Sequence, residues 1–227
     1  MKEVRVCQVD AFTEEPFGGN PAGVVLEAGS LEDREMQLIA REMNLSETAF
    51  VTSSDKADFR VRFFTPGEEV DLCGHATVGT FHALHEKGFL ESNRSVFTQE
   101  TRAGVLEVER SFQGERPLFT MTQARPRYRD MRDAVKEIAE ILNLDERDLM
   151  EQAPLKISTG LWWLVVGIKK LETLQNLAPS MEALRNFSKN YGVVGMVPLS
   201  LETLNPERSY HMRAFAPLVG IAEDPVC

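Results

Sequence analysis

One short pattern occurs twice in this chain, and it strongly constrains the fold. Residues 62–66 read Arg-Phe-Phe-Thr-Pro and residues 213–217 read Arg-Ala-Phe-Ala-Pro, so both follow the pattern Arg-x-Phe-x-Pro. Each copy is followed by an acidic residue and then by a cysteine, and these cysteines are Cys73 and Cys227. A chain of 227 residues can hold two domains of about 110 residues each. The repetition therefore predicts two pseudo-equivalent α/β domains.

Hydrophobic patterning predicts a similar order of elements in both halves. Strands and a helix precede each copy of the pattern. A mostly apolar helix at 74–87 follows the first copy, whereas no helix follows Cys227. A sheet without its central helix would leave apolar surface in water, so we expect the second domain to be truncated in this sequence. The predicted helices are residues 30–43, 74–87, 133–144 and 180–190.

The stretch at 115–131 contains two prolines and several arginines, which is typical of a connection between domains. We therefore predict an N-terminal domain at residues 1–123. The C-terminal domain is predicted at residues 124–227.

Composition limits the class of ligand. The formal net charge is -10, whereas binding to nucleic acids or to an anionic membrane needs a basic surface. The start of the chain has no apolar targeting segment, and no apolar run reaches membrane-spanning length. Three cysteines are too few for a disulfide framework and favour reduced thiols in the cytoplasm. These features predict a cytoplasmic protein whose ligand is a small molecule or a protein, without nucleic-acid or membrane partners.

Glu47 is the first candidate for chemistry. It stands between turn-forming residues and an apolar strand, where its carboxylate would be half buried. Burial raises the pKa of a carboxyl group and makes it a better general base and acid near neutral pH. A surface glutamate, or a cap on a local turn, is the structural alternative.

His75 and Gly74 begin the apolar helix at 74–87. The helix dipole disfavours a cationic ring at this end, so a neutral imidazole that can polarise a substrate is expected. The backbone N–H groups of Gly74 and His75 would suit a substrate carboxylate. A capping histidine or a satisfied core histidine is the structural alternative.

Other polar residues have weaker signals. Asp224, before Pro225, and Asn20, in Gly-Gly-Asn-Pro-Ala-Gly, are candidates for substrate contacts and are also common turn residues. His82 and His85 have a helical spacing that could hold a metal, but no further ligands with a zinc signature occur. We therefore expect no metal site.

Four stretches of the chain resemble the phenazine-biosynthesis-type (PhzF-like) isomerases, which have the diaminopimelate-epimerase-like fold. They are residues 9–26, 44–51, 62–79 and 213–227, and they match in order and spacing. The resemblance implies an α+β fold of two pseudo-equivalent domains, each a rolled, mostly antiparallel sheet around a central helix, with the active site between them. It also implies a homodimer that needs no metal or organic cofactor.

The same resemblance implies roles for individual residues. Glu47 aligns with the residue that shuttles the proton, Ser46 with a substrate-contacting position, and Asp224 with a substrate-positioning aspartate. The implied reaction moves a proton on a small carboxylate-bearing substrate and shifts a double bond. The predicted catalytic residues are Glu47, His75 and Asp224, and the predicted substrate-binding residues are Asn20, Ser46, Cys73, Gly74 and Cys227.

Cys73 and Cys227 leave a second enzyme class open. Cofactor-independent amino-acid racemases and epimerases of this fold use two facing cysteines at helix N-termini, where a thiolate is stabilised. In the isomerase interpretation the same thiols are bystanders or modulators. A degenerate member that serves as a binding module or scaffold is the non-enzyme alternative.

Overall fold

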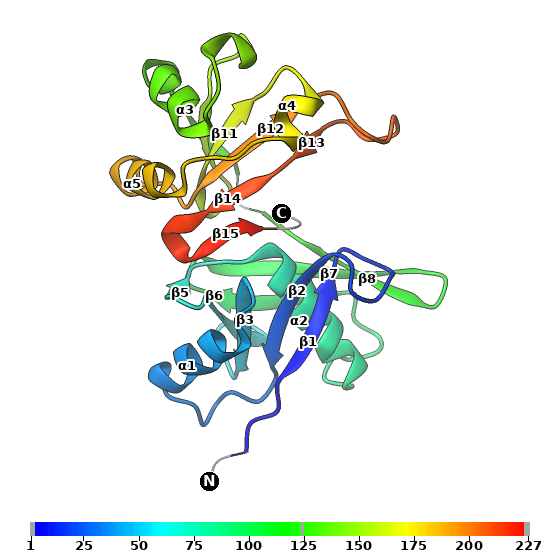
Figure 1. Cartoon of the computed structure of the whole chain (residues 1–227). Helices are drawn as coiled ribbons and strands as arrows, with labels where there is room; N and C mark the ends of the chain where they lie inside the picture. The colour runs from blue at the N-terminus through cyan, green and yellow to red at the C-terminus, as the bar shows by residue number, and fades with distance from the viewer. Residues whose placement is uncertain (1–2, 124, 225–227) are drawn as a thin grey trace. The chain divides into compact units, whose positions relative to one another are not determined.

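The computed structural model describes residues 3–123 and 125–224 of the chain. The chain forms two compact units, residues 1–124 and residues 125–227 (Figure 1). Within the described ranges, no helix has both the length and the apolar character needed to cross a membrane.

Unit 1 consists of an eight-stranded sheet and two helices. The strand order is β1-β2-β3-β4-β6-β7-β8, with β5 paired to β4. Neighbouring strands are antiparallel except for the parallel pairs β2–β3 and β4–β6. The elements in chain order are β1 (Cys7–Ala11), β2 (Asn20–Val25), α1 (Asp33–Met43), β3 (Glu47–Thr52), β4 (Phe59–Phe64), β5 (Glu69–Val70), α2 (Gly74–Glu86), β6 (Val96–Thr101), β7 (Gly104–Gln113) and β8 (Arg116–Met121).

The sheet of unit 1 is rolled around α2. This helix contacts β1 and β8, which are the two ends of the strand order, and also β2 and β3 (Figure 1). One helix can touch both ends of a sheet only if the sheet curls around it. Small residues on α2 permit this approach: an ideal Cβ at Gly79 would lie 3.4 Å from Cβ of Val9 and 3.7 Å from Cβ of Ala22. The mostly apolar sequence of α2 is thus explained by its burial on several sides.

Successive side chains of β3 point to opposite faces of this sheet. Ala49 packs in one cluster with Ala76 of α2, whereas Phe50 packs in another with Met36 of α1. Odd-numbered positions of β3 therefore face α2, and even-numbered positions face α1. Glu47 is at an odd-numbered position, so its side chain points to the inner, α2 face.

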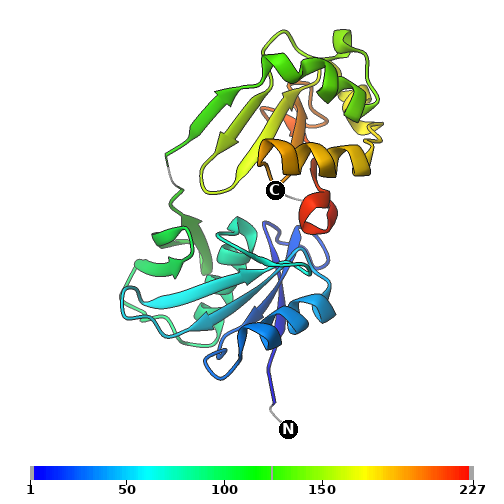
Figure 2. The ribbon, with the colours of Figure 1, turned by 90° about the vertical axis from the view of Figure 1, so that its left-hand side faces the viewer.

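Unit 2 consists of a seven-stranded sheet with helices packed against it. The strand order is β15-β14-β12-β11-β10-β9, with β13 paired to β12. Figure 2 shows α3 and α5 beside these strands, and the core of the unit includes residues from both helices and from β11. The elements are β9 (Arg127–Asp130), the 3-10 helix η1 (Arg132–Ala134), α3 (Val135–Leu142), η2 (Glu146–Asp148), β10 (Leu155–Ser158), β11 (Trp162–Gly167), α4 (Leu171–Gln175), α5 (Met181–Tyr191), β12 (Met196–Ser200), β13 (His211–Met212), β14 (Ala214–Ala216), η3 (Pro217–Val219) and β15 (Ile221–Asp224).

The two units repeat one topology. In unit 1, β1 pairs antiparallel with β2, α1 connects β2 to the parallel strand β3, and β4 and β5 follow as antiparallel neighbours. In unit 2, β10 pairs antiparallel with β11, α4 and α5 connect β11 to the parallel strand β12, and β14 and β15 follow in the same way. The predicted fold class, α+β with two pseudo-equivalent curled sheets, is confirmed.

The Arg-x-Phe-x-Pro pattern makes equivalent contacts in both units. Nε and Nη2 of Arg62 donate to the two carboxylate oxygens of Glu69 at 2.8 and 2.7 Å, and the guanidinium lies 5.1 Å from the ring of the phenylalanine in the pattern. Nε and Nη2 of Arg213 donate to those of Glu223 at 2.7 and 2.8 Å, with its phenylalanine ring at 4.8 Å. Such two-pronged ion pairs have a defined geometry. They hold β5 against β4 and β15 against β14.

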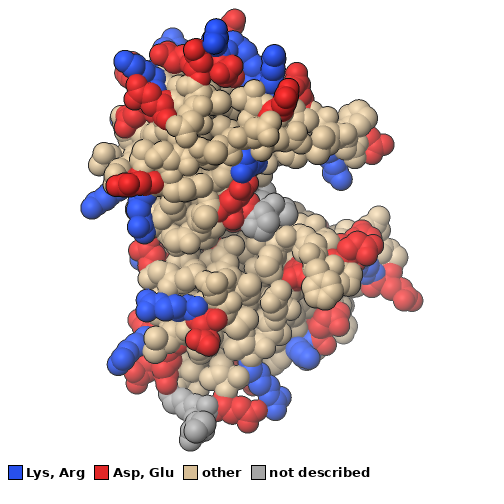
Figure 3. Space-filling model, viewed as in Figure 1, with Lys and Arg blue, Asp and Glu red and all other residues tan. Residues whose placement is uncertain are grey.

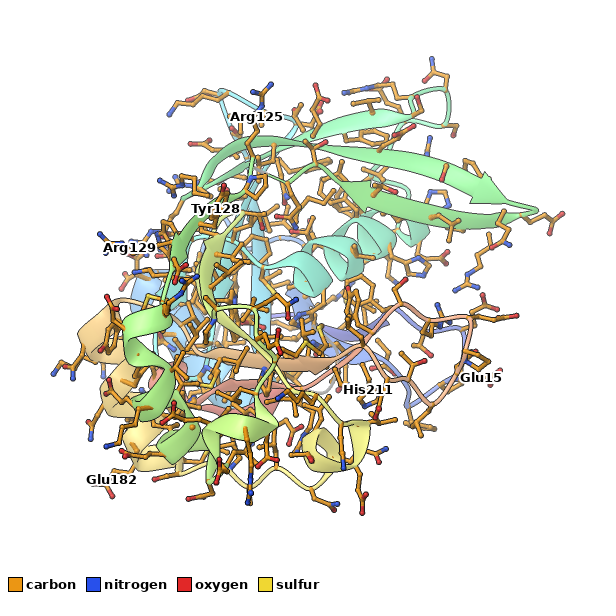
Figure 4. All side chains as sticks on the ribbon, turned by 90° about the horizontal axis from the view of Figure 1, so that it is seen from above. Glu15, Arg125, Tyr128, Arg129, Glu182 and His211 are labelled. Carbon is orange, nitrogen blue, oxygen red and sulfur yellow. The ribbon has the colours of Figure 1, made fainter. Side chains whose placement is uncertain are left out.

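The stretch at 115–131, predicted as a connection between domains, contains the boundary between the two units, which falls after residue 124, but it also contains two strands. It holds β8, at one end of the sheet of unit 1, and β9, at one end of the sheet of unit 2. Proline is tolerated in edge strands because one side of such a strand has no ladder partner. All of β9 is exposed, including Tyr128 and Arg129 (Figure 4). Charged residues on an exposed edge strand discourage pairing with other chains. Linkers are also rich in charged residues, so composition alone does not distinguish the two.

The surface charge is mixed in sign. Acidic and basic side chains are interspersed on the face shown in Figure 3. That face therefore has no basic stripe of the kind that binds nucleic acid, which agrees with the formal net charge of -10.

We predict that Gly19→Ala destabilises unit 1. Gly19 has a φ of 65°, and an ideal Cβ there would lie 2.1 Å from the backbone oxygen of Ala11. The strained backbone alone costs about 1–3 kcal/mol. The measurement is thermal unfolding by circular dichroism, with amide hydrogen exchange followed over β1 and β2.

Gly29→Ala is the matched control for this substitution. Its φ is not left-handed, and an added Cβ would meet no atom within 4 Å. We expect a change within about 0.5 kcal/mol. Equal stability of the two variants would show that the turn before β2 does not depend on Gly19.

Candidate functional site

Three candidate side chains meet where the N-terminus of α2 lies against the start of β3. Ligand atoms of Glu47, Cys73 and His75 lie within 4.8 Å of one another, and all three residues are buried. The Sγ atom of Cys73 is 3.3 Å from Nδ1 of His75. On the other side of the same ring, Nε2 of His75 is 3.4 Å from Oε2 of Glu47. The structure thus groups a carboxyl group, an imidazole and a thiol, each of which the sequence marked as a candidate.

Local structure places Glu47 in this group. It is the first residue of β3 and pairs in parallel register with Ala22 of β2. Asn44 ends α1 in a left-handed conformation with a φ of 51° and turns the chain into β3. Glu47 is only 8% exposed, so the alternative of a surface glutamate is wrong.

The predicted binding residues of unit 1 lie on the same elements. Asn20 begins β2 and is fully buried, and it faces the same side as Ala22 because side chains alternate along a strand. Ser46, half-buried, directly precedes Glu47. Gly74, also half-buried, is the first residue of α2. Ser46 and Gly74 are adjacent in sequence to members of the buried group, and Asn20 is two residues before Ala22, the sheet partner of Glu47.

The N-terminus of α2 has the properties of an anion site. The first backbone N–H groups of a helix have no partner within the helix, and the helix dipole adds positive potential there. Cys73 is the N-cap residue, and its side chain makes no capping hydrogen bond. The first turn of α2 contains no acidic residue that would compete for these groups. Such a helix N-terminus favours an anionic group.

Two supporting residues were missed in the sequence analysis. Oγ1 of Thr77 donates to the backbone oxygen of Cys73 at 2.7 Å, and Nε2 of Gln99 lies 3.3 Å from Oγ1 of Thr77. Both side chains are fully buried. They fix the end of α2 that carries Cys73. The i, i+4 spacing of Cys73 and Thr77 was available in the sequence, but the position of Gln99 on β6 depends on the rolled sheet.

Burial controls the charge of His75. Its ring is 6% exposed, and this burial lowers the pKa of His75 to about 4. The imidazole is therefore neutral near neutral pH, as expected from the helix dipole. With a neutral ring, the 3.4 Å approach of Nε2 to Oε2 of Glu47 is not an ion pair.

The same three side chains are the group of described residues that could hold a metal ion. A thiolate, an imidazole and a carboxylate are the donor types of zinc. The ring of His75, however, presents Nδ1 to Cys73 and Nε2 to Glu47. Each ring nitrogen therefore already has a protein neighbour.

The remaining predicted residues belong to unit 2. Asp224 is the last residue of β15, pairs with Ala214 of β14 and is half-buried. It is thus the end of a strand, and Pro225, which the turn alternative involves, lies outside the described residues. Cys227 lies outside the described residues.

Sequence comparison identifies the family of this chain. The PhzC-PhzF family, described as phenazine biosynthesis-like proteins, matches residues 9–227. The chain belongs to this family. The resemblance stated from the sequence motifs is therefore confirmed.

Relatives of the chain agree with the family. The uncharacterized isomerase YfhB of Bacillus subtilis is 39% identical over 228 residues, which cover 100% of this chain and 78% of the relative. The crystal structure of a PhzF-family phenazine biosynthesis protein from Bacillus anthracis matches with a TM-score of 0.88 and 39% identity, over 100% of this chain and 76% of that one. These relatives support an isomerase or epimerase-like function.

A more distant structure shares the fold alone. A probable proline racemase from Agrobacterium radiobacter matches with a TM-score of 0.63 at 10% identity, over 98% of this chain and 73% of that one. The two-unit fold therefore extends beyond the PhzC-PhzF family.

We predict that the ring of His75 titrates with a midpoint near pH 4. The measurement is the pH dependence of the histidine ring resonances by NMR, with His75 assigned by its absence in His75→Gln. A midpoint at the ordinary value of about 6.5 would contradict the burial argument.

Stability should follow the same titration. Between pH 6.5 and 4, the unfolded chain binds more protons at this position than the folded chain does. The free energy of unfolding of the wild type should therefore fall more on acidification than that of His75→Gln, by at most about 3 kcal/mol. Parallel pH profiles of the two proteins would contradict this result.

Proposed function

We propose that this chain is a PhzF-like, cofactor-independent isomerase that moves a proton on a small carboxylate-bearing substrate, with Glu47 as general base and general acid. The observation that carries the proposal is the burial of Glu47 beside the neutral ring of His75. A carboxylate in such a place has few uses in packing, because burying an acid is costly.

The first step is binding of the substrate carboxylate. The N–H groups at Gly74 and His75 offer positive potential and hydrogen bonds for it. Asn20 and Ser46 add polar groups from β2 and from the residue before β3. For Asp224, the family resemblance implies a role in positioning the substrate, and Cys227 remains a predicted substrate-binding residue that is a bystander or modulator in the isomerase interpretation.

The second step is proton transfer. Glu47 removes a proton from a carbon that an adjacent unsaturated or carboxylate-bearing group makes acidic. The C–H bond breaks, an O–H bond forms on Glu47, and the electron pair of the C–H bond shifts into a new double bond as the old one opens. Glu47 then returns the proton to the carbon at the far end of the shifted system. The atoms balance, and no step requires an oxidant, a reductant or a metal.

General acid–base catalysis of this kind supplies about 10²–10⁴-fold of rate. Electrostatic stabilisation of the developing negative charge must supply much of the rest. The helix N-terminus and His75 are the groups of unit 1 that are suited to it.

We predict that Glu47→Gln lowers turnover by at least about 10²-fold, because an amide cannot accept the proton. The measurement is a screen of small unsaturated acids and amino acids in D₂O, with deuterium uptake and double-bond position read by NMR. Cys73→Ala should stay within about tenfold of the wild type. A Glu47→Gln variant with wild-type turnover would refute the proposal.

A two-cysteine racemase is the second candidate, and the position of Cys73 as the N-cap residue of α2 favours it. It requires the opposite result in the same screen: Cys73→Ala abolishes turnover, thiol alkylation inactivates the protein, and deuterium enters a stereocentre. The thiol of Cys73 lies 3.3 Å from Nδ1 of His75, which supports a role in orienting the histidine rather than in attacking the substrate. We therefore rank this candidate second.

If the wild type labels none of these compounds, the chain is a binding module or scaffold instead. The proposed assembly is a homodimer in the cytoplasm, on the basis of family resemblance and of cysteine usage. Light scattering on the purified chain tests the dimer directly, since a single species with the mass of one chain would contradict it.

A further inference from the structure

The ring of His75 lies between a thiol and a carboxyl group. Nδ1 is 3.3 Å from Sγ of Cys73, and Nε2 is 3.4 Å from Oε2 of Glu47. Within the part of the chain that the structure describes, Nε2 of His75 makes no hydrogen bond. A neutral imidazole carries one proton on either nitrogen. Its tautomer therefore decides whether His75 presents a donor or an acceptor on the side of Glu47.

The thiol settles one end of the ring. Cys73 is 8% exposed, and burial disfavours the charged form of a thiol. A neutral thiol has a single proton and can donate it to an acceptor. When Sγ donates to Nδ1, that nitrogen must be bare, and the proton of the ring must be on Nε2.

The carboxyl group of Glu47, on the other side of the ring, favours the same tautomer of His75. An ionised carboxylate is an acceptor only. A bare Nε2 at 3.4 Å from Oε2 would bring two electron-rich atoms close together, which is repulsive. An Nε2–H bond in the same place is attractive, and hydrogen bonds at catalytic sites are often long until substrate binds.

We propose that Cys73 is a positioning residue that holds His75 in its Nε2–H tautomer. The hydrogen-bond donor is then directed to the side of the ring where Glu47 and the substrate react. Its catalytic consequence rests on the proposed function. While Glu47 is anionic, Nε2–H stabilises the base; once Glu47 has taken the proton, Nε2–H is available for negative charge that develops on the substrate. A donor that is already oriented costs no reorganisation during the reaction.

The test is the tautomer itself, measured without substrate. Whole chain labelled with ¹⁵N at histidine is examined by long-range ¹H–¹⁵N correlation, which separates protonated from bare ring nitrogens. The expected wild-type spectrum has Nε2 protonated and Nδ1 bare at His75, with the signals assigned by their loss in His75→Gln. A wild-type spectrum with the proton on Nδ1 overturns the proposal, whatever the variants do.

Two substitutions of Cys73 separate a positioning role from a packing role. Cys73→Ala removes the donor, and the ratio of the two tautomers should move toward Nδ1–H by about two- to tenfold, the size of one ordinary hydrogen bond. Cys73→Ser keeps a donor and should restore the wild-type ratio. An unchanged ratio in a folded Cys73→Ala overturns the proposal, as does a serine variant that behaves like alanine.

Cys7→Ala is the matched control. Cys7 is in β1 of the same unit, and its thiol donates to the backbone oxygen of Val24 at 3.4 Å rather than to a histidine. This variant should leave the tautomer of His75 unchanged. A shift of the same size as in Cys73→Ala would show a general effect of thiol removal and overturn the proposal.

Turnover in the D₂O assay distinguishes this inference from the proposed function. Cys73→Ala should lower kcat by about two- to tenfold, and Cys73→Ser should recover it. If Glu47→Gln keeps its turnover while the tautomer is as expected, the proposed function fails and the role of Cys73 stands. If Glu47→Gln is inactive while the wild-type proton is on Nδ1, the proposed function stands and the role of Cys73 fails.

Discussion

The burial of α2 within a rolled sheet is the constraint on which unit 1 depends. A helix that touches β1, β2, β3 and β8 needs small residues on several sides, and a Cβ added at Gly79 would already be in van der Waals contact with Val9 of β1 and Ala22 of β2. In return, the enclosing sheet removes the first turn of the helix from water. Cys73 and His75 are buried for this reason, and the potential of the helix N-terminus acts in surroundings where water screens it weakly.

The chemistry of the site follows from that burial. Desolvation keeps the ring of His75 neutral near neutral pH, so the ring carries one proton and no charge. Glu47 is the first residue of β3, and the odd-numbered side chains of this strand face α2. Its carboxyl group therefore lies on the side of the sheet that holds His75. The side chains of Thr77, in α2, and Gln99, in β6, form hydrogen bonds that hold the same end of the helix in place. The site is thus made from one helix terminus and the ends of two parallel strands, which are rigid elements well suited to holding a proton donor and a proton acceptor at fixed distance.

The duplicated pattern has a physical role that is separate from catalysis. In each unit an arginine holds a glutamate on the next strand with two hydrogen bonds and lies over the ring of a phenylalanine. In unit 1, the chain passes from Glu69 to Cys73 in four residues, so this ion pair sets the path that leads into α2. The repetition was visible in the sequence because the ion pair needs particular side chains at particular positions. By contrast, β8 and β9 were missed because prolines and charged residues occur in edge strands as well as in linkers.

The sequence by itself determined the duplication, the family, the apolar helix at 74–87 and the identity of Glu47, Cys73 and His75 as candidates. These follow from side-chain chemistry and from patterns along the chain, both of which are local. Only the tertiary structure decided that Glu47 is buried, that its carboxylate and the thiol of Cys73 lie on opposite sides of one ring, and that Gln99 supports the helix end from β6. Such facts depend on strand register and on the curl of the sheet, which arise from contacts between residues far apart in the chain.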